Sequence, residues 1–515
     1  MSVALGQDIF WDTKNYHLYN AWAFLHDRYA QDIAAAGMQS FFNPLPDVPY
    51  FVLAQGPLRD WPRALAALQG FWYGTLVFLV LQIAERLARL QHRRFGIADL
   101  CAALIGATGT MAISQVGSTT NEIQLAVCLL LGLYMLMPLL APSGAERSGW
   151  RSWWAGACCG LAVGLKPTAA VYPPAMAVAL LFAMGIGTRT AWKAVTLYAM
   201  GTAMAFLLAY GAWGWHLYQA TGNPLFPLFN HIFHSPLTAM TEGTDGRFRP
   251  HTLAQWLFYP FFWIRKQQLL VTEVPFADPR YALAMLSLLG VLAARWMTRG
   301  GAKTGNRALC FLAIFFGVGY VLWLMLFSIL RYAVPLEALT GLLLLGAIRA
   351  WKPGAWPPSA RSTSIASVTA LVAIVAMSSY PSWWRGVYAR HVLEVRAPVV
   401  EANSLVVLAG SPDAYLAPVL SRQSGVSFVG LTWFTNASRG YGLWDRTLQR
   451  LAGHEGPMYV VRRDDPNNAN ELALLREMLP NRHEADCEAI QSNLEAGRRG
   501  KSYAAGLSLC RLVEN

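Results

Sequence analysis

The chain has 515 residues, of which 55% are hydrophobic and only 14% are charged, whereas soluble globular proteins carry about 25% charged residues. This composition excludes an ordinary soluble protein and indicates a chain that lipid partly solvates. A net charge of +12 would suggest a nucleic-acid partner in a soluble protein, but the excess here falls in short loops between apolar runs, so no nucleic acid is expected.

The first 62 residues form a polar and aromatic segment before the first apolar run. Aromatic rings prefer the headgroup zone of a bilayer, so we expect this segment to contain helices that lie in the interface plane. No signal peptide precedes Asp8 that could carry the segment across a membrane. We expect the segment either to insert with the first helical hairpin or, as we favour, to follow a helix encoded upstream.

Ten apolar runs follow, and a helix needs about 20 such residues to cross a bilayer. The runs lie near 63–84, 98–116, 121–140, 152–165, 167–186, 190–213, 281–298, 308–329, 331–349 and 363–380. The fourth and fifth runs meet at Lys166-Pro167, so they are predicted as two short spans with a tight turn or as one broken element. The sequence therefore predicts an α-helical polytopic membrane protein with about ten transmembrane helices.

Lysine and arginine in short loops indicate which side of the membrane is cytoplasmic. One alternate set of loops is rich in them, and only Glu85 and Glu146 oppose them there. The basic residues of this set are Arg86, Arg89, Arg93, Arg94, Arg147, Arg151, Arg189, Lys193, Arg295, Arg299, Lys303, Arg307, Arg349, Lys352 and Arg361. Residues 1–62, 117–120, 214–280 and the tail from about 381 are then extracytoplasmic. The loop 214–280 is also aromatic, and we expect interfacial helices in it as well.

The tail alternates short apolar strands with helical segments. Strands are predicted at Ser404–Leu408, Val426–Leu431, Pro457–Val461 and Leu507–Leu512, and helices at Arg446–Ala452 and Asn470–Leu479. This pattern indicates a small α/β domain. We therefore divide the chain into a transmembrane domain, 1–384, and an extracytoplasmic α/β domain, 385–515.

Two of the seven cysteines lie in this polar tail, and the other five lie in apolar runs. A cysteine in an apolar run is usually a small buried hydrophobe. Cys487 and Cys510 are thus the pair that could form a disulfide in an oxidising compartment.

The stretch from Asp8 to Asn20 holds Asp8, Asp12, Lys14 and His17 just before an aromatic, helical-looking segment. A carboxylate at the membrane surface beside an apolar cavity can serve as a general base, because desolvation raises the pKa of such a group. Carboxylate oxygens can also hold a divalent metal ion. The alternative is a solvated loop in which Asp12 is an ordinary helix N-cap.

Two cations stand at the outer ends of predicted spans. Lys166 could bind a lipid phosphate, or it could be a lysine that snorkels from a helix end. Arg331, which Tyr332 follows, could pair with phosphate through its planar guanidinium, or it could be an interfacial anchor.

Other motifs limit the chemistry further. The turn-forming stretch Thr221–Asn230, with Asn223 in it, is interpreted as architecture that shapes a loop over a cavity. His231 and His234 lack a cysteine or paired acid that would complete a zinc site, so no metal site is predicted. A Walker A loop and a nucleotide-binding glycine-rich turn are also absent from the sequence, so ATP hydrolysis is not expected.

Taken in order, several short motifs resemble those of bacterial membrane glycosyltransferases of the GT-C superfamily, whose members include protein mannosyltransferases and lipid A aminoarabinose transferases. The motifs are Asp12 with Asn15-Tyr16-His17, Phe42-Asn43-Pro44, Gly164-Leu165-Lys166, Gly222-Asn223-Pro224-Leu225-Phe226-Pro227, Arg331-Tyr332 and the soluble outer tail. As architecture, the resemblance covers most of the chain.

The resemblance implies a polyprenyl-phosphate sugar donor and an acceptor hydroxyl on a cell-envelope glycan, lipid or protein, at the periplasmic side of the bacterial inner membrane. It implies a catalytic carboxylate in the first outer loop, for which Asp12 matches best and Asp8 second. It also implies cations that stabilise the leaving lipid phosphate, and Lys166 and Arg331 are the candidates for this role. Supporting roles then fall to Lys14, Asn15, Tyr16, His17, Asn223 and Tyr332.

The chain departs from the family pattern in two ways. The usual first span before the acidic loop is absent, and Asp8 and Asp12 are four residues apart where the family has adjacent acids. The second departure leaves open whether the protein uses a divalent cation, and we expect that it uses none.

Two other functions remain open from the sequence. A lipid-linked sugar or polysaccharide transporter, or flippase, would use the same cations to escort a phosphate headgroup. Transporters usually show inverted repeats and polar residues at mid-membrane depth, whereas the conspicuous polar residues here lie at outer helix ends. An assembly protein whose tail binds a partner is the third possibility.

Overall fold

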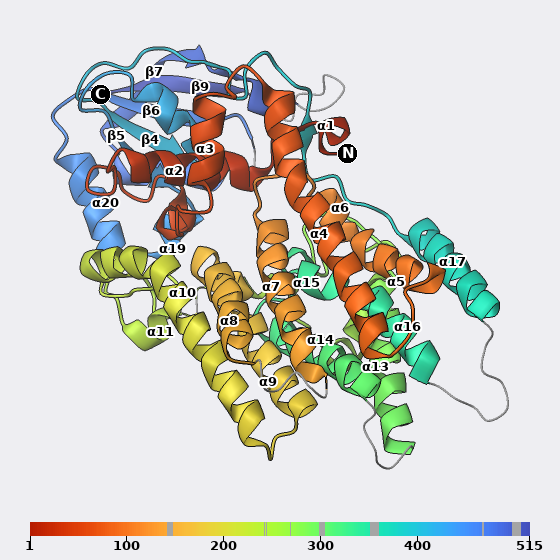
Figure 1. The fold of residues 1–515 in the computed structure, drawn as a ribbon. Helices are drawn as coiled ribbons and strands as arrows, with labels where there is room; N and C mark the ends of the chain where they lie inside the picture. Colours follow the sequence, from red (N-terminus) through yellow and green to blue (C-terminus); the bar gives the residue numbers. More distant parts are fainter. Residues whose placement is uncertain are drawn as a thin grey trace.

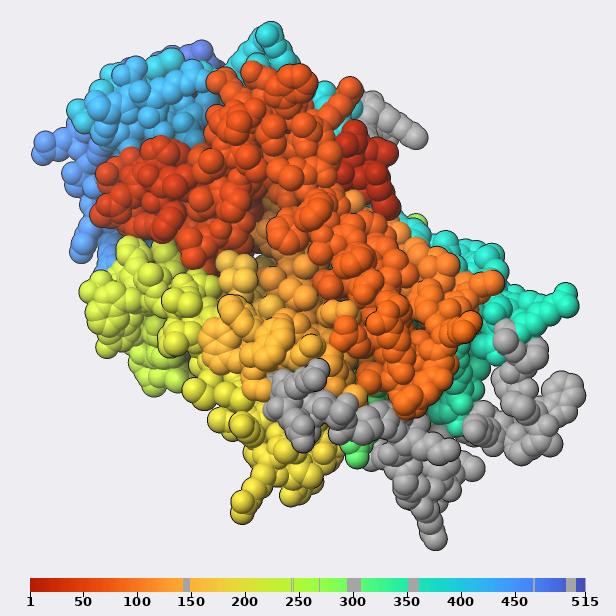
Figure 2. Space-filling view, in the orientation of Figure 1, coloured from red at the N-terminus to blue at the C-terminus, as the bar shows by residue number. Residues whose placement is uncertain are grey.

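The computed structural model describes residues 1–141, 148–241, 243, 245–267, 269–297, 304–350, 360–465, 468–496 and 506–514. Helices form one body, and a β-sheet caps one end of it (Figure 1). The first sixty residues lie between the two (Figure 2). The predicted fold class, a multi-pass helical protein with a sheet-containing C-terminal region, is thereby confirmed, while the count of ten transmembrane helices stays a prediction.

Helices occupy all ten of the predicted apolar runs. They are α4 (Pro62–Leu90), α5 (Ile97–Ala107) with α6 (Thr110–Ser114), α7 (Glu122–Leu136), α8 (Ser148–Leu165), α9 (Tyr172–Met184), α10 (Arg189–Thr221), α13 (Arg280–Met297), α14 (Thr304–Leu326), α15 (Val334–Glu337) with α16 (Thr340–Ala350), and α17 (Ala360–Met377). Among the described residues, five helices are long and apolar enough to cross a membrane, or six if the pair around α15 and α16, bent by 45°, counts as one span.

Two of the predicted continuous runs are broken, and in the first of them a side chain from a distant part of the chain enters the break. Between α5 and α6, the Glu337 carboxylate accepts hydrogen bonds from the Met111 and Ala112 backbone N–H groups at 3.0 and 2.9 Å. It thus satisfies the free N-terminal donors of α6. A Cβ added at Gly109 would lie 2.1 Å from this carboxyl carbon, so glycine is needed there. Glu337 itself ends α15, which places it at the second break.

Helices α8 and α10 approach each other more closely than bulky side chains would allow. Added Cβ atoms at Gly156 and Gly160 would lie 1.9 and 2.1 Å from the carbonyl oxygens of Tyr198 and Thr202, and one at Gly164 would lie 2.7 Å from the Ala209 Cβ. Small residues at four-residue spacing allow such packing of membrane helices. α8 then ends at Leu165, because a residue before proline disfavours the helical conformation and Lys166 is extended.

The C-terminal sheet has five strands in the order β5-β4-β6-β9-β7. Its strands are β4 (Leu405–Ala409), β5 (Ser427–Leu431), β6 (Met458–Arg463), β7 (Arg482–Ala489) and β9 (Leu507–Glu514), and the helices α20 (Gly442–Ala452) and α21 (Ala469–Met478) complete this region. β4 pairs in parallel with β5 and β6, whereas β9 is antiparallel to β6 and β7. All four predicted strands and both predicted helices are present; the polar edge strand β7 was missed because it lacks an apolar run.

Residues 1–62, which we call the first outer segment after their predicted side of the membrane, cover one face of this sheet. The segment contains α1 (Ser2–Leu5), β1 (Gln7–Asp8), α2 (Leu18–Leu25) and α3 (Val48–Gln55), and the Ile33 N–H donates to the Phe428 carbonyl at 2.8 Å. Tyr16, Tyr19 and Trp22 are buried in the same core as β4 and β5. The expectation that the aromatic residues of this segment face lipid headgroups is therefore wrong for these three, because the sheet offers them a dry surface instead.

The remaining elements join these parts. They are α11 (Asn230–Phe233) and α12 (Leu253–Phe258) in the second loop, and β2 (Arg385–Gly386), β3 (Val395–Arg396), α18 (Ala417–Leu420), α19 (Trp433–Ala437) and β8 (Gln491–Ser492) in the tail. β1 pairs with β2, so the first residues of the chain are tied to the entry of the tail. Among the predicted basic loop residues, Arg147, Arg299, Lys303 and Lys352 lie outside the described residues, as does Glu146.

Candidate active site

Asp12 lies where the first outer segment turns into a short π-helix, η1 (Thr13–His17). Its side chain caps no backbone N–H of this helix, so the alternative that made Asp12 an ordinary N-cap is wrong. Instead, the Oδ2 atom accepts hydrogen bonds from the Tyr16 hydroxyl at 3.3 Å and from Arg331 Nη1 at 2.9 Å. The Asp12 side chain is only 7% exposed and that of Arg331 only 11%, so water screens this ion pair weakly.

Arg331 and Tyr332 come from η8 (Leu330–Ala333), the turn that precedes α15. The guanidinium lies 5.6 Å from the ring centroid of Phe10 and 5.3 Å from that of Tyr332, which are cation–π distances. The Tyr172 hydroxyl donates to the Tyr332 carbonyl at 2.6 Å. Contacts with two separate segments therefore hold the guanidinium beside Asp12.

Lys166 follows α8 and lies near the same tyrosine, Tyr332. Its ammonium donates to Glu122 Oε1 at 2.6 Å and to the Thr120 carbonyl at 2.9 Å, and it lies 5.7 Å from the Tyr332 ring centroid. The Asn43 amide donates to the Gly164 carbonyl at 2.8 Å, two residues before Lys166. The first outer segment thus also fixes the end of the helix that presents this lysine.

A buried histidine and its carboxylate partner complete the cluster. His17 Nδ1 lies 2.6 Å from Asp47 Oδ1, and the Asn121 amide donates to the same oxygen at 2.8 Å. Asn121 directly precedes the Glu122 that pairs with Lys166, and the rings of His17 and Tyr16 lie 4.2 Å apart. Asn121 and Glu122 thus connect the His17–Asp47 pair to Lys166, and Tyr16 connects it to Asp12. We use the name outer cluster for Asp12, Tyr16, His17, Asp47, Asn121, Glu122, Lys166, Arg331 and Tyr332.

Three buried polar atoms of the outer cluster have no hydrogen-bond partner within the described part of the chain. They are His17 Nε2, Glu122 Oε2 and Arg331 Nε. Buried polar groups in folded proteins are almost always bonded, so these atoms can serve a bound molecule. Burial, together with the nearby Asp12 carboxylate, raises the pKa of Tyr16 well above its usual value, so its hydroxyl stays protonated and remains a donor.

A small cavity lies against the outer cluster. Its polar lining comes from Glu122, Thr168, Tyr172 and Tyr332, and its apolar lining from Leu125, Leu129, Ala169 and Pro335. The cavity therefore has polar groups beside the Lys166–Glu122 pair and apolar walls from α7, from the 3₁₀-helix η5 (Pro167–Val171) and from α15. This lining matches the anionic head and the first hydrocarbon groups of a lipid phosphate in chemistry, but the cavity has a volume of only about 10 Å³ and would have to widen to admit one.

Asp8, the second predicted catalytic acid, lies in a different environment. Its Oδ1 accepts the Phe10 N–H at 3.0 Å, and its Oδ2 accepts the Thr13 hydroxyl at 2.9 Å and the Thr119 N–H and hydroxyl at 2.9 and 3.0 Å. These bonds fasten the start of the outer segment to the turn before α7. The geometry therefore favours Asp12 over Asp8 for chemistry.

Three of the predicted supporting residues also lie outside the outer cluster. The Asn15 amide donates to the Ala36 carbonyl at 3.2 Å, and the Asn223 side chain donates to the Leu228 carbonyl at 3.0 Å, within its own turn. Lys14 points toward the C-terminal sheet region and pairs with Glu495 at 3.0 Å. These residues shape the backbone around the site.

Sequence reasoning missed Glu122, Asn121 and Asp47. Glu122 had a usable signal, because an acidic residue at the start of an apolar span is costly unless it is paired, and it follows Thr-Thr-Asn. Asp47 carries no comparable signal. In the sequence it reads as an ordinary turn residue between two prolines, and only the fold brings it to His17.

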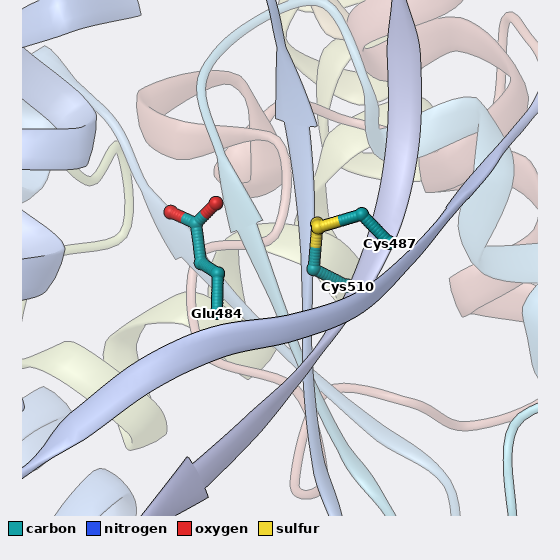
Figure 3. Close-up of side chains that lie close together, drawn as sticks. All are labelled: Glu484, Cys487 and Cys510. Atoms are coloured by element: carbon teal, nitrogen blue, oxygen red, sulfur yellow. A yellow bond between two sulfur atoms is a disulfide. The ribbon is translucent and has the colours of Figure 1, made fainter. Parts of the chain in front are cut away.

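One group of side chains outside the outer cluster has metal-ligand types at close range within the described residues. Glu484, Cys487 and Cys510 lie together on β7 and β9 (Figure 3). Cys487 and Cys510, predicted as a possible pair, are joined as a disulfide, and a disulfide offers no thiolate to a metal. Glu484 also pairs with Arg462 at 2.7 Å. This group is therefore a cross-strand link.

The fold is similar to that of solved structures of one protein. ArnT from Cupriavidus metallidurans bound to undecaprenyl phosphate superposes with a TM-score of 0.52 at 13% sequence identity, over 99% of this chain and 95% of that one. Its apo form matches with a TM-score of 0.43 at 14% identity, over 97% and 92% of the two chains. No protein-family model matches the sequence, and no curated protein sequence is significantly similar to it.

Proposed function

We propose that this protein is a membrane glycosyltransferase of the GT-C type that moves a sugar from a polyprenyl-phosphate donor to an acceptor hydroxyl. The observation that carries the proposal is the meeting of Asp12, Arg331 and Lys166 around Tyr332, beside a cavity with apolar walls. These residues come from three distant segments. The fold shared with ArnT, which was crystallised with undecaprenyl phosphate, adds support.

In the proposed reaction, Asp12 accepts the proton of the acceptor hydroxyl while the hydroxyl oxygen attacks the anomeric carbon. The bond between that carbon and the phosphate oxygen breaks, and its electron pair leaves with the phosphate. The products are a glycoside and a polyprenyl phosphate that carries one more negative charge than the donor did. Arg331 and Lys166 stabilise this developing charge. Tyr16 holds the Asp12 carboxylate in place through its hydrogen bond.

The proposal also sets the location of the reaction. The outer cluster lies beside the C-terminal sheet region, since its Tyr16 is buried in the same core as β4 and β5. With basic loops in the cytoplasm, this region lies on the periplasmic side of a bacterial inner membrane. A cell-envelope glycan, lipid or protein would then supply the acceptor hydroxyl.

The proposal can be tested with the purified protein in vesicles that contain native host membrane lipids. A panel of undecaprenyl-phosphate hexoses and pentoses, radiolabelled in the sugar, is supplied from the outer side. The wild type is expected to release undecaprenyl phosphate and to transfer label to a membrane acceptor. Asp12→Asn is expected to lose about 10²–10⁴-fold in rate, the usual contribution of a general base.

Asp27→Asn is the matched control, because Asp27 belongs to the same outer segment but is exposed to solvent. It should transfer sugar at the wild-type rate. Full activity of Asp12→Asn would remove Asp12 from the mechanism. Movement of the labelled lipid across the vesicle without any new glycosidic product would replace the proposal with the transporter alternative.

A further inference from the structure

A buried ion pair joins the acid-bearing segment to the C-terminal domain. Lys14 lies in η1, two residues after Asp12, and its ammonium is 3.0 Å from Glu495 Oε2. The Lys14 side chain is 10% exposed and that of Glu495 is 8% exposed. In the sequence these residues are 481 positions apart, so the pair exists only because the outer segment packs on the sheet.

Glu495 is itself held by the sheet. Arg463 at the end of β6 donates to both of its oxygens, at 2.7 and 3.0 Å, and the Tyr415 hydroxyl donates at 2.9 Å. Arg463 also pairs with Asp413 at 2.6 Å. Burial alone would raise the pKa of Glu495, but Arg463 and Lys14 outweigh it and lower the pKa to about 2. Glu495 ends the short 3₁₀-helix η11 (Asn493–Glu495) and is an anion held in place by Arg463 of β6 and by Tyr415.

Lys14 lies near the start of a helix that runs without a break from Trp11 to Leu25. The first part of this helix, η1, is a π-helical turn, a rare conformation that occurs mostly as single turns inside α-helices and often at functional sites. Desolvating two charges costs several kcal/mol, and packed apolar side chains of similar volume often serve stability as well or better. Stability alone therefore does not explain a buried ion pair at this position. The pair fixes the orientation of η1 and of Asp12, which directly precedes it.

We infer that the Lys14–Glu495 ion pair is a positioning device through which the C-terminal domain sets the orientation of Asp12 toward the donor. This inference rests on the proposed function, since it takes Asp12 as the base. It gives the C-terminal domain a part in the catalytic step itself, as the anchor of the segment that carries the acid. Lys14 then acts through Asp12 and touches no substrate.

Lys14→Met is the appropriate variant, because it removes the charge and keeps most of the side-chain volume. In that variant Glu495 still has Arg463 and Tyr415 as partners, so the sheet region should fold normally. Removing Glu495 would instead leave the Lys14 charge buried without its partner. A loss of activity in that variant could then come from misfolding as well as from a misplaced Asp12. Lys14→Arg restores the charge and serves as the rescue variant.

Arg28→Met is a closely matched control. Arg28 pairs with Asp32 at 2.7 Å, donates to the Val426 carbonyl at 2.6 Å, and is 11% exposed. Its ion pair lies within the outer segment, and its hydrogen bond to Val426 joins that segment to the residue before β5, sixteen residues after Asp12. Arg28 is therefore a cation of similar exposure to Lys14 that also contacts the C-terminal region, but away from the acid. Both variants should lose similar thermal stability, and only a positioning role predicts different kinetics.

The first measurement is sugar transfer from the labelled undecaprenyl-phosphate donors. Lys14→Met is expected to lower kcat about 10–100-fold, because small misplacements of a catalytic group cost this much, with KM for the donor within about twofold, since Arg331 and Lys166 still bind the phosphate. Arg28→Met should keep kcat, and Lys14→Arg should recover most of it. Wild-type kcat in Lys14→Met, or an equal loss in Arg28→Met, would overturn the inference.

The second measurement, amide hydrogen exchange, does not depend on activity. Residues 13–17 should exchange faster in Lys14→Met than in the wild type or in Arg28→Met, because η1 loses its anchor. Unchanged exchange in Lys14→Met would overturn the positioning role even if kcat fell. If the wild type transfers no sugar while exchange responds as expected, the proposed function fails and the structural anchor stands.

Discussion

The ion pair between Asp12 and Arg331 can be measured without knowing the substrate, through a double-mutant cycle. At a separation of 2.9 Å, two unit charges attract by about 6 kcal/mol with an effective dielectric constant of 20, and desolvation offsets part of this. Breaking such a buried pair by removing one partner typically costs about 3–5 kcal/mol, because the other charge stays buried alone. Asp12→Asn and Arg331→Met should therefore each lower the free energy of unfolding substantially.

The double variant should cost clearly less than the sum of the two single variants, with a coupling of about 2–3 kcal/mol. The assay is unfolding in mixed detergent–denaturant micelles, followed by tryptophan fluorescence. Arg439 and Glu477, an exposed pair on the sheet region, provide the control cycle and should behave additively. Additivity within about 0.5 kcal/mol for Asp12 and Arg331 would show that the two side chains do not meet, and the proposed site would lose its basis.

Three further predictions concern the surroundings of this pair. Lys166→Met should weaken the binding of undecaprenyl phosphate about 10–100-fold in native mass spectrometry, since a charge-assisted hydrogen bond contributes about 1.5–3 kcal/mol; unchanged binding would exclude Lys166 from the phosphate site. Because the pKa of Glu495 lies near 2 in the folded protein and near 4.3 in an unfolded chain, its contribution of about 3 kcal/mol is present above about pH 4.3 and lost as pH falls toward 2. The melting temperature should therefore fall between pH 5 and pH 3 in the wild type and fall less in Glu495→Gln. Gly160→Leu should destabilise the helical body by about 1–3 kcal/mol or more, because α8 and α10 must separate, whereas Gly74→Leu on α4, where an added Cβ meets nothing within 4 Å, should leave the melting temperature unchanged.

The positions of the elements could be predicted because they depend on local composition. Apolar runs of spanning length marked the helices, and alternating short apolar and polar runs marked the strands of the C-terminal region. The prediction failed where a distant side chain decides the outcome. The break between α5 and α6 depends on Glu337, which lies more than 220 residues away. No feature of the sequence around residues 107–110 indicates that the helix breaks there.

The candidate site divides in the same way. Asp12, Lys166 and Arg331 could be singled out because charges next to apolar runs are costly and need a reason. Their geometry could not be foreseen, since Tyr332 brings the two cations together only after helices from three parts of the chain have packed. His17 and Asp47 are 30 positions apart in a turn-rich segment, and only the folded backbone makes them partners.

Hydrophobicity and charge act residue by residue, so the linear sequence was enough to identify a helical membrane protein with a mixed α/β region at its C-terminal end and with charges at the ends of its helices. The folded chain was needed to show that the first sixty residues lie against the C-terminal sheet, that Asp8 fastens a turn while Asp12 meets Arg331, and that Lys14 reaches Glu495. Pairings of this kind depend on contacts between segments that lie hundreds of residues apart. Such contacts form and stabilise the protein only after those segments have packed together, so the local sequence does not reveal them.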